Sequence, residues 1–197
     1  GATFQKKLSE VAKDNEIGGL EFLSCIPGSV GGGIRMNSGC FDQEFKDVLV
    51  SIQYVDYKGI IKTISANKIN FNYRNTDLPQ DIIFLSATFK GTNKKKNEIE
   101  NYMNELQTKK EKSQPTRIKT SGSTFKNPKD QTNIKVWKLI KDSVPNELNF
   151  GDAMISEKHA NFFVNKKNAK FQDMKSLIDY VKNKVKDKTG VDINLEI

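Results

Sequence analysis

The chain has 197 residues, of which 36% are hydrophobic and 28% are charged, so it is long enough to bury a core in one large domain or two small ones. The 32 lysines and arginines exceed the 24 acidic residues and give a formal charge of +8, which suits an anionic ligand but is more commonly a solvated, lysine-rich surface. Because no apolar run approaches the ~18 residues of a membrane span and the first residues lack a signal-peptide pattern, we expect a cytoplasmic protein without membrane insertion.

Cysteine and histidine are scarce, which limits metal and redox chemistry. Cys25 and Cys40 are the two cysteines and His159 is the one histidine, so neither a Cys/His zinc site nor a Cys-x-x-Cys pair can form. A disulfide between the two cysteines is compatible with their spacing, but two reduced thiols are commoner in a chain without a secretory signal. We expect no metal, and we expect His159 to be a hydrogen-bonded structural residue rather than a catalyst.

The N-terminal part begins with a predicted helix over residues 4–15, where Phe4, Leu8 and Val11 recur at helical spacing and Gly18-Gly19 follows as a terminator. The next segment, residues 20–40, contains five of the 13 glycines of the chain. Such clustering is typical of backbone that closely approaches a ligand, and a tight structural turn explains it equally well. The segment lacks the spacing of both the P-loop and the dinucleotide-binding fingerprint.

A β-hairpin is predicted next, because apolar residues alternate over residues 48–56 and a Lys-Gly turn precedes residues 60–64. A further strand is predicted at residues 82–89, after the segment 71–76, which is too polar for the core. Helical spacing around residues 99–106 predicts a helix that ends before Gln114-Pro115, because residues that precede proline avoid helical angles. We place a boundary there, between a domain of residues 1–113 and a domain of residues 114–197.

The second part opens with a turn-rich segment at residues 120–128 and continues into a short helix around residues 136–140. A strand is expected around residues 161–164. A long helix carrying apolar residues from 174 to 185 is expected to end at Gly190, and residues 191–197 alternate as a closing strand. Helices and strands mix without strict βαβ alternation, which indicates the α+β class.

Three polar residues are candidates for chemistry, each with a commoner structural explanation. Arg74 lies in a polar segment between strands, where a guanidinium can bind a carboxylate or phosphate with two hydrogen bonds, although a surface ion pair is more common. Ser123 is more commonly a helix cap than a nucleophile, because Gly-x-Ser-x-Gly is absent. Glu196 lies on the predicted closing strand and is expected to face solvent unless a partner holds it.

Seven motifs in order along the chain resemble one enzyme family: Leu20-Glu-Phe-Leu, Ile26-Pro-Gly-Ser-Val-Gly-Gly, Met36-Asn-x-Gly39, Tyr73-Arg74, Gln114-Pro115, Gly122-Ser-Thr-Phe-Lys-Asn-Pro128 and Ser156-x-Lys-His-Ala-Asn-Phe. This combination is similar to the UDP-N-acetylmuramate dehydrogenase family, also called UDP-N-acetylenolpyruvoylglucosamine reductases. These are flavin enzymes of peptidoglycan precursor synthesis, and so of cell wall biogenesis, cell shape and cell division. The resemblance implies that FAD, reduced by NADPH, supplies a hydride that converts UDP-N-acetylglucosamine enolpyruvate into UDP-N-acetylmuramate.

The resemblance also implies roles for individual residues. Ser123 would be the proton donor, and Arg74 and Glu196 would complete the catalytic set. Lys126 and Asn127 match positions that hold the substrate. The residues expected to lie against FAD are Ile26, Pro27, Gly28, Gly31, Gly32, Asn37 and Gly39.

The same resemblance implies the second half of a PCMH/VAO-type FAD-binding domain followed by a small α+β substrate-binding domain. By this resemblance the chain is expected to begin inside the flavin domain, so we expect the segment that binds the FAD pyrophosphate to lie upstream. Three positions depart from the family pattern: Cys25 replaces a glycine, Gly33 stands where alanine is common, and Asn194 replaces the first acid of a Leu-Glu-x-Glu pattern.

Two alternatives remain open from the sequence. A truncated, non-catalytic remnant would bind only the UDP-sugar through residues 114–197. A nucleic-acid binder would need aromatic residues interleaved with basic ones, and Phe162-Phe163 near Lys166-Lys167 is a weak version that is more simply explained as the end of a buried strand. We therefore expect no nucleic-acid partner.

Overall fold

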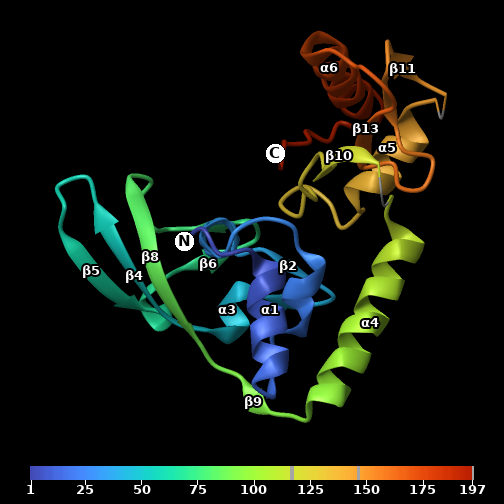
Figure 1. The fold of residues 1–197 in the computed structure, drawn as a ribbon. Coiled ribbons are helices and arrows are strands. Elements are labelled where there is room, and N and C mark those ends of the chain that lie inside the picture. The colour runs from blue at the N-terminus through green and yellow to red at the C-terminus, as the bar shows by residue number, and fades with distance from the viewer. Residues whose placement is uncertain (116–117, 146, 197) are drawn as a thin grey trace. The chain divides into compact units, whose positions relative to one another are not determined.

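Two separate hydrophobic cores organise the chain. The computed structural model describes residues 1–115, 118–145 and 147–196, and it divides into two compact units, Gly1–Lys110 and Glu111–Ile197 (Figure 1). The first core is built around Phe22, Phe45 and Ile52, and the second contains large side chains such as Phe125 and Phe163. The division lies close to the predicted domain boundary between residues 113 and 114.

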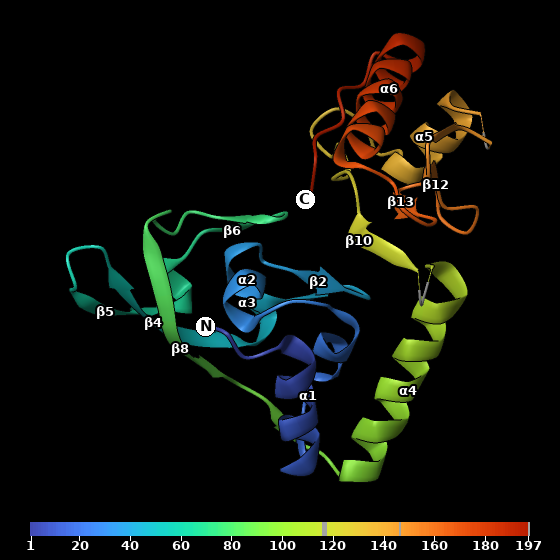
Figure 2. The same ribbon diagram turned by 45° about the horizontal axis from the view of Figure 1, so that its top comes forward.

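The helices that precede residue 49 lie beside the three-stranded sheet of the first unit (Figure 2). Helix α1 (Gln5–Asp14) confirms the helix predicted from the spacing of apolar residues, and it packs against the 3-10 helix η1 (Glu21–Cys25). Helix α2 (Val30–Arg35) occupies the glycine-rich segment, where we had predicted only a close approach or a tight turn. Glycine disfavours helix, so packing and the cap supplied by Ser29, whose Oγ accepts a hydrogen bond from Gly32 N at 3.2 Å, stabilise it.

The sheet of the first unit is antiparallel, in the order β5-β4-β8. Strands β4 (Leu49–Asp56) and β5 (Ile61–Ser65) confirm the predicted hairpin, and β8 (Ile82–Phe89) confirms the further strand. In the hairpin turn, Asp56 Oδ1 accepts hydrogen bonds from Lys58 N and Ile60 N, each at 3.0 Å. Shorter elements are β1 (Ile17–Gly18), β2 (Gly39–Cys40), β3 (Gln43–Glu44), α3 (Phe45–Val48), η2 (Ala66–Lys68), β6 (Phe71–Asn72), β7 (Asn75–Thr76) and β9 (Thr92–Asn93).

Helix α4 (Lys96–Ser113) ends directly before Gln114-Pro115, as the proline predicted. It buries Ile99 and Leu106, and its remaining surface is rich in charge. None of the helices among the described residues combines the length and the apolar character needed to cross a membrane.

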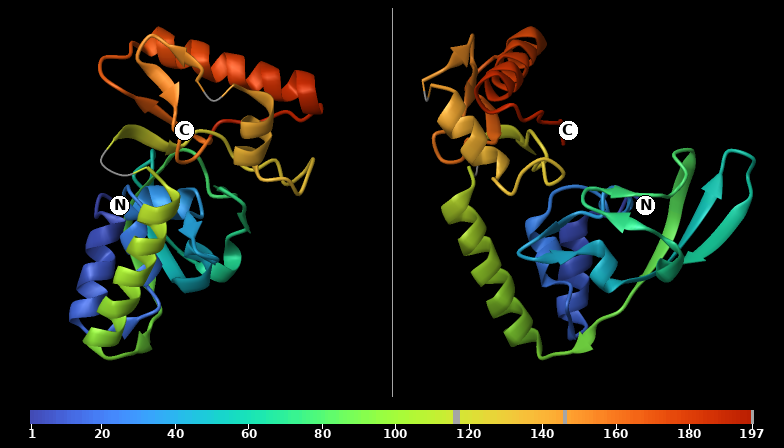
Figure 3. Two further views of the ribbon diagram at one scale, coloured as in Figure 1. Left: turned by 90° about the vertical axis from the view of Figure 1, so that its right-hand side faces the viewer. Right: turned by 180° about the vertical axis from the view of Figure 1, so that it is seen from behind.

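The second unit contains a four-stranded antiparallel sheet in the order β10-β13-β12-β11. Helix α6 (Phe171–Thr189) packs against helix α5 (Val136–Ser143) and against strands β11 (Asn149–Phe150) and β12 (Ala153–Ile155) (Figure 3). Both helices and strand β13 (Phe162–Asn165) were predicted, and Gly190 ends α6 with a φ of 72°. Every strand pair formed by the described residues is antiparallel, which agrees with a mixed fold of helices and strands.

Two predictions for this unit were wrong. The turn-rich segment contains a strand, β10 (Lys119–Ser123), because its backbone pairs with β13 despite its polar side chains. The C-terminal segment forms one isolated bridge, Phe125 to Leu195, in place of the predicted closing strand. Pairing stops there because Asp192 N donates to the side-chain oxygen of Gln131 and not to a neighbouring strand. Ile197 lies outside the described residues.

Candidate active site

Ser123 and Glu196 lie on adjacent paired segments of the second unit. Ser123 is the last residue of β10, and the chain after it runs antiparallel to the C-terminal segment. Glu196 N donates to the carbonyl oxygen of Thr124 at 2.9 Å, and Lys126 N donates to that of Asn194 at 2.8 Å. Both the Ser123 and the Glu196 side chains are half-buried. The backbone thus brings the predicted proton donor and the predicted catalytic carboxylate into one local structure.

Ser123 does not cap a helix, so that structural prediction was wrong. Its backbone pairs with Phe162 at the end of β10, because the neighbouring strand supplies the hydrogen-bonding partners of this segment. The adjacent Thr124 is fully buried, and its Oγ1 has no hydrogen-bond partner among the described residues.

Asn161 fixes the main chain that follows Ser123. Its side-chain oxygen accepts a hydrogen bond from Phe125 N at 3.0 Å, and its side-chain nitrogen donates to the Phe125 carbonyl oxygen at 2.8 Å. Its own carbonyl oxygen accepts from Thr124 N at 2.8 Å, and the residue is 4% exposed. We assigned no role to Asn161 from the sequence, although it belongs to one of the motifs; its polar side chain directly before a buried strand was the available signal.

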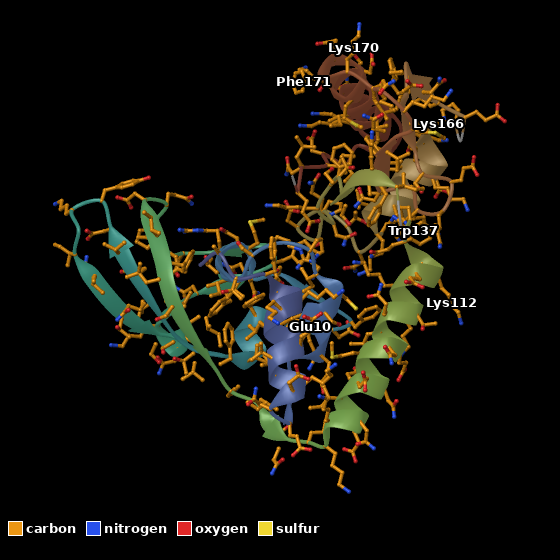
Figure 4. All side chains as sticks on the ribbon, viewed as in Figure 1. Glu10, Lys112, Trp137, Lys166, Lys170 and Phe171 are labelled. Atoms are coloured by element: carbon orange, nitrogen blue, oxygen red, sulfur yellow. The ribbon has the colours of Figure 1, made fainter. Side chains whose placement is uncertain are left out.

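His159 is a hydrogen-bonded structural residue, as predicted. Its Nδ1 accepts a hydrogen bond from Asn161 N at 3.2 Å. Its ring packs against Phe162 and Trp137, with centroid distances of 4.9 and 6.4 Å, and Trp137 is labelled on α5 in Figure 4. Burial lowers the pKa of the imidazole below its usual range, because desolvation disfavours the charged form.

The two predicted substrate-binding residues lie between Ser123 and α5. Asn127 Oδ1 accepts a hydrogen bond from Val136 N, the first residue of α5, at 3.0 Å. Lys126 is half-buried and is held by its backbone bond to Asn194. Asn127 therefore has a structural role at the start of α5, and its contact with substrate stays a prediction, as does that of Lys126.

Arg74 belongs to the first unit and occupies the tight turn between β6 and β7, with a φ of 54°. Its Nη2 donates to the Gly39 carbonyl oxygen at 3.2 Å, and its guanidinium carbon lies 5.0 Å from the centroid of the Tyr73 ring. The hydrogen bond and the ring contact orient a half-buried cation. Against the effect of burial, hydrogen bonds from Lys46 and Asn37, together with the charges of Lys46 and Arg74, lower the pKa of Glu44.

The glycines of residues 26–39 differ in what surrounds them. A Cβ at Gly33 would lie 2.4 Å from Phe45 Cε2, one at Gly39 would lie 2.2 Å from the Gln43 carbonyl oxygen, and one at Gly31 would lie 3.1 Å from that of Gly1. At these three positions, contacts within the protein are sufficient to explain why the residue is glycine. Gly28, with a φ of 109°, and Gly32 are exposed, so their backbone is accessible.

The other residues of this segment that were predicted to contact the flavin differ in how exposed they are. Asn37 is fully buried: its Nδ2 donates to Glu44 Oε2 and to the Asn72 carbonyl oxygen, and its Oδ1 accepts from Lys46 N. Ile26 is half-buried and Pro27 is exposed. Among the described residues, no group of three or more His, Cys, Asp or Glu side chains could hold a metal ion.

Comparison with known proteins identifies the family. The chain is 63% identical, over 196 residues and 100% of its length, to the UDP-N-acetylenolpyruvoylglucosamine reductase of Pelagibacter ubique. It also matches the crystal structure of UDP-N-acetylenolpyruvylglucosamine reductase (MurB) from Thermus caldophilus with a TM-score of 0.83 and 31% identity, covering 98% of this chain and 68% of that one. The chain belongs to the UDP-N-acetylenolpyruvoylglucosamine reductase family. The family resemblance predicted from the seven motifs is therefore confirmed.

Other members of the reductase family agree with this assignment. The sequence model for the C-terminal domain of UDP-N-acetylenolpyruvoylglucosamine reductase matches residues 114–197. The reductase of Rickettsia bellii is 40% identical over 190 residues, which are 96% of this chain. This chain spans 65% of the length of the Pelagibacter ubique reductase and 62% of the Rickettsia bellii reductase.

Proposed function

We propose that this chain supplies the catalytic residues of an FAD-dependent, NADPH-driven reductase that converts UDP-N-acetylglucosamine enolpyruvate into UDP-N-acetylmuramate for peptidoglycan synthesis. The observation that carries the proposal is the backbone pairing of Thr124 with Glu196, in a chain that belongs to the reductase family. This pairing gives a hydroxyl and a carboxylate neighbouring positions, as proton donation with an orienting acid requires. Because the proposed reaction uses NADPH, a reductant of the cytoplasm, we also propose that the protein acts there.

The first unit offers surfaces that fit part of an FAD molecule. Gly28 and Gly32 are exposed and carry no side chain of their own, which allows a flat ring to lie against the main chain there. Gln5 Oε1 is buried without a hydrogen-bond partner among the described residues, and Gln5 Nε2 reaches the same segment by donating to the Ser29 carbonyl oxygen at 3.2 Å. Gly28, Gly32 and Gln5 would help to hold FAD, which would supply the hydride-transfer chemistry that links NADPH to the enolpyruvyl group.

Arg74 stabilises the negative charge that develops on the substrate carboxylate. A guanidinium stays protonated at any physiological pH and presents N–H donors in a planar fork that suits a carboxylate. Its contacts with Gly39 and Tyr73 fix its orientation before substrate binds. The interaction strengthens as the carboxylate takes on enolate character, so it lowers the barrier as well as aiding binding.

Ser123 donates the proton that completes the reduction. A hydroxyl is a weak acid at neutral pH, so it protonates only a strongly basic carbon held within hydrogen-bond reach. Glu196 orients and polarises this site from the paired segment. Lys126 and Asn127 bind the polar groups of the UDP-sugar, for which a cationic side chain and an amide are suitable partners.

The test uses a chimera in which the part of the Pelagibacter ubique reductase that this chain does not cover is joined to it. Purified with FAD, the chimera is expected to show flavin absorbance and to oxidise NADPH when the enolpyruvyl substrate is added. Ser123→Ala is expected to keep the flavin spectrum and to lower the rate of product formation by about 10²–10⁴-fold, the usual contribution of a general acid. A chimera that stays colourless in the presence of FAD would contradict the proposal.

The alternative of a UDP-sugar binder without catalysis is an outcome of the same test. In that case, calorimetry would detect binding of the UDP-sugar to this chain, and neither the chain nor the chimera would oxidise NADPH. Equal product formation by Ser123→Ala and the unchanged chimera would remove Ser123 from the mechanism while leaving the reductase activity in place.

A further inference from the structure

The C-terminal segment, residues 191–196, pairs with another part of the chain over a short stretch. Two backbone hydrogen bonds, at Thr124 and Lys126, flank an isolated bridge between Phe125 and Leu195. A strand pair this short specifies its register weakly, and a slip of one residue turns every side chain to the opposite face. The position of the carboxylate that follows Leu195 therefore depends on further contacts of this segment.

The side chain of Gln131 supplies two such contacts. Its Nε2 donates a hydrogen bond to the Asp192 carbonyl oxygen at 2.8 Å, and Asp192 N donates to its Oε1 at 2.9 Å. A side-chain amide offers the same donor and acceptor as a peptide group, so Gln131 takes the place of a backbone partner beside this segment. A shift of the segment along its own direction therefore breaks both hydrogen bonds.

Gln131 is fixed to the loop that contains the predicted substrate-binding residues. Its N–H donates to the carbonyl oxygen of Pro128 at 3.0 Å, and Pro128 is buried. The residue before this proline, Asn127, accepts a hydrogen bond from the start of α5. On the other side, Asp192 Oδ1 lies 3.0 Å from Lys186 Nζ of α6. The two hydrogen bonds of Gln131 therefore join a fixed loop to a segment whose start is held beside α6.

We propose that Gln131 is a positioning residue, which sets the register of the C-terminal segment and so holds Glu196 next to the chain that follows Ser123. The inference rests on the proposed reductase function, in which Glu196 orients and polarises the site of proton donation. Because an extended chain rises about 3.3 Å per residue, a slip of two residues would move the carboxylate by roughly 7 Å. That distance exceeds hydrogen-bond reach, so the carboxylate would no longer act on the group that it orients.

The first test measures amide hydrogen exchange in the 197-residue chain and needs no flavin. In Gln131→Ala, the peptide that contains Asp192 and Glu196 is expected to exchange about 2–10-fold faster, because the hydrogen bond that protects the Asp192 amide is lost. Gln172→Ala is the matched control, because Gln172 is exposed and its Nε2 donates to Ser176 Oγ within the same helix at 3.4 Å. The control is expected to leave this peptide unchanged, and equal exchange in Gln131→Ala and the parent chain would overturn the proposal.

The second test separates the two half-reactions of the FAD-loaded chimera by stopped-flow absorbance. Reduction of the flavin by NADPH precedes the step that Glu196 serves, so Gln131→Ala is expected to leave its rate unchanged. Reoxidation of the reduced flavin by the enolpyruvyl substrate is expected to slow by about 10–100-fold, since a small displacement of an orienting group has an effect of this order. Equal slowing of both half-reactions would indicate a general structural effect and would overturn the proposal.

Two further variants sharpen the test. Gln131→Glu keeps the acceptor for Asp192 N but places a carboxylate against the Asp192 carbonyl oxygen, so it is expected to act in the same direction and serves if Gln131→Ala does not fold. The double variant Gln131→Ala/Glu196→Gln is expected to reoxidise the flavin as slowly as Glu196→Gln alone, because a positioning residue acts only through the group that it positions. Independent, multiplying effects of the two changes would overturn the proposal.

The outcomes distinguish this inference from the proposed function. A colourless chimera would contradict the proposed function, and the exchange measurement would still decide whether Gln131 holds the C-terminal segment. An active chimera in which Gln131→Ala reoxidises the flavin at the unchanged rate would overturn the role of Gln131 and leave the reductase activity in place.

Discussion

Asn161 shows how one buried amide can fix the main chain beside a candidate catalytic residue. Its side chain bonds both the N–H and the carbonyl group of Phe125, two residues after Ser123. Replacing a buried amide that hydrogen-bonds two backbone groups lowers stability, because the two groups are left without partners. The position of the main chain beside Ser123 therefore depends on a residue that directly precedes the neighbouring strand, β13.

Asn161→Ala is expected to lower the free energy of unfolding of the second unit, because it leaves two backbone groups of Phe125 unpaired at roughly 1–3 kcal/mol each. Urea unfolding followed by circular dichroism measures this change. Asn168→Ala is a suitable control because Asn168 is exposed, and it is expected to change stability by less than about 0.5 kcal/mol. Equal effects of the two substitutions would contradict the role given to Asn161.

His159 is expected to make the protein less stable as the pH falls below about 6.5. Burial lowers the pKa of the folded imidazole below its usual value of 6.5, so the unfolded chain binds the proton more readily. The stability is complete above the pKa of the unfolded chain and is lost as the pH falls toward that of the folded state. Protonation of Nδ1 also removes the acceptor used by Asn161 N.

The measurement compares the unfolding free energy of the unchanged chain and of His159→Asn between pH 7.5 and 5. Asparagine can accept the same backbone hydrogen bond two residues on, but it does not titrate in this range. We expect the difference between the two proteins to shrink as the pH falls, even if the variant is less stable throughout. Groups that titrate alike in both proteins cancel in this comparison. A difference independent of pH would disprove the prediction.

At the scale of the element, α2 illustrates how packing overrides helix propensity. The helix contains three consecutive glycines, of which Gly33 is the last. The structure gives the reason for glycine at this position, because the ring of Phe45 occupies the space that a Cβ at Gly33 would need. Phe45 is fully buried and lies edge-on to Phe89 at a centroid distance of 5.9 Å, so its ring has little room to move aside.

Gly33→Ala is therefore expected to destabilise the first unit by about 1–3 kcal/mol, although alanine is the better helix former. Combining it with Phe45→Leu is expected to cost less than the sum of the two single changes, because leucine vacates part of the contested space. Gly32→Ala is the matched control: Gly32 is exposed, and the substitution is expected to stabilise by up to about 1 kcal/mol. Thermal unfolding of all four variants checks these signs, and strict additivity of the double variant would refute the packing explanation.

Over the whole molecule, each of the two units has a core of its own. The residues of the first core end at Leu106, and those of the second begin at Phe125. A unit with its own core and a boundary at an X-Pro segment is expected to fold independently. The family match to residues 114–197 alone agrees with this expectation.

We therefore expect residues 111–197 to fold when expressed alone, with dispersed amide resonances and a cooperative thermal transition. Asn161→Ala is expected to lower the midpoint of this isolated unit and of one transition in the whole chain. Gly33→Ala is the control, since it belongs to the other core and is expected to leave that transition unchanged. An isolated fragment without cooperative unfolding, or one transition shifted by both variants, would contradict independent folding.

Local regularity made part of this fold predictable. Helices α1, α4 and α6 follow from apolar spacing within short windows, since each helical hydrogen bond joins residues four apart. The β4–β5 hairpin follows from alternation and a Lys-Gly turn. The family likeness was visible in motifs, because they are runs of adjacent residues in a fixed order. The sequence by itself therefore determined the longer helices, the longest strands, their order and the family.

The tertiary structure alone decided how the candidate site is assembled. Strand pairing joins residues that are far apart in the sequence, such as Ser123 with Phe162 and Phe125 with Leu195, and no local pattern records such partners. For that reason β10 was predicted as a turn, the closing strand proved to be a single bridge, and the amide of Asn161 was overlooked. The close contact between Gly33 and Phe45 could not be predicted from the sequence either, because it exists only in the packed tertiary structure.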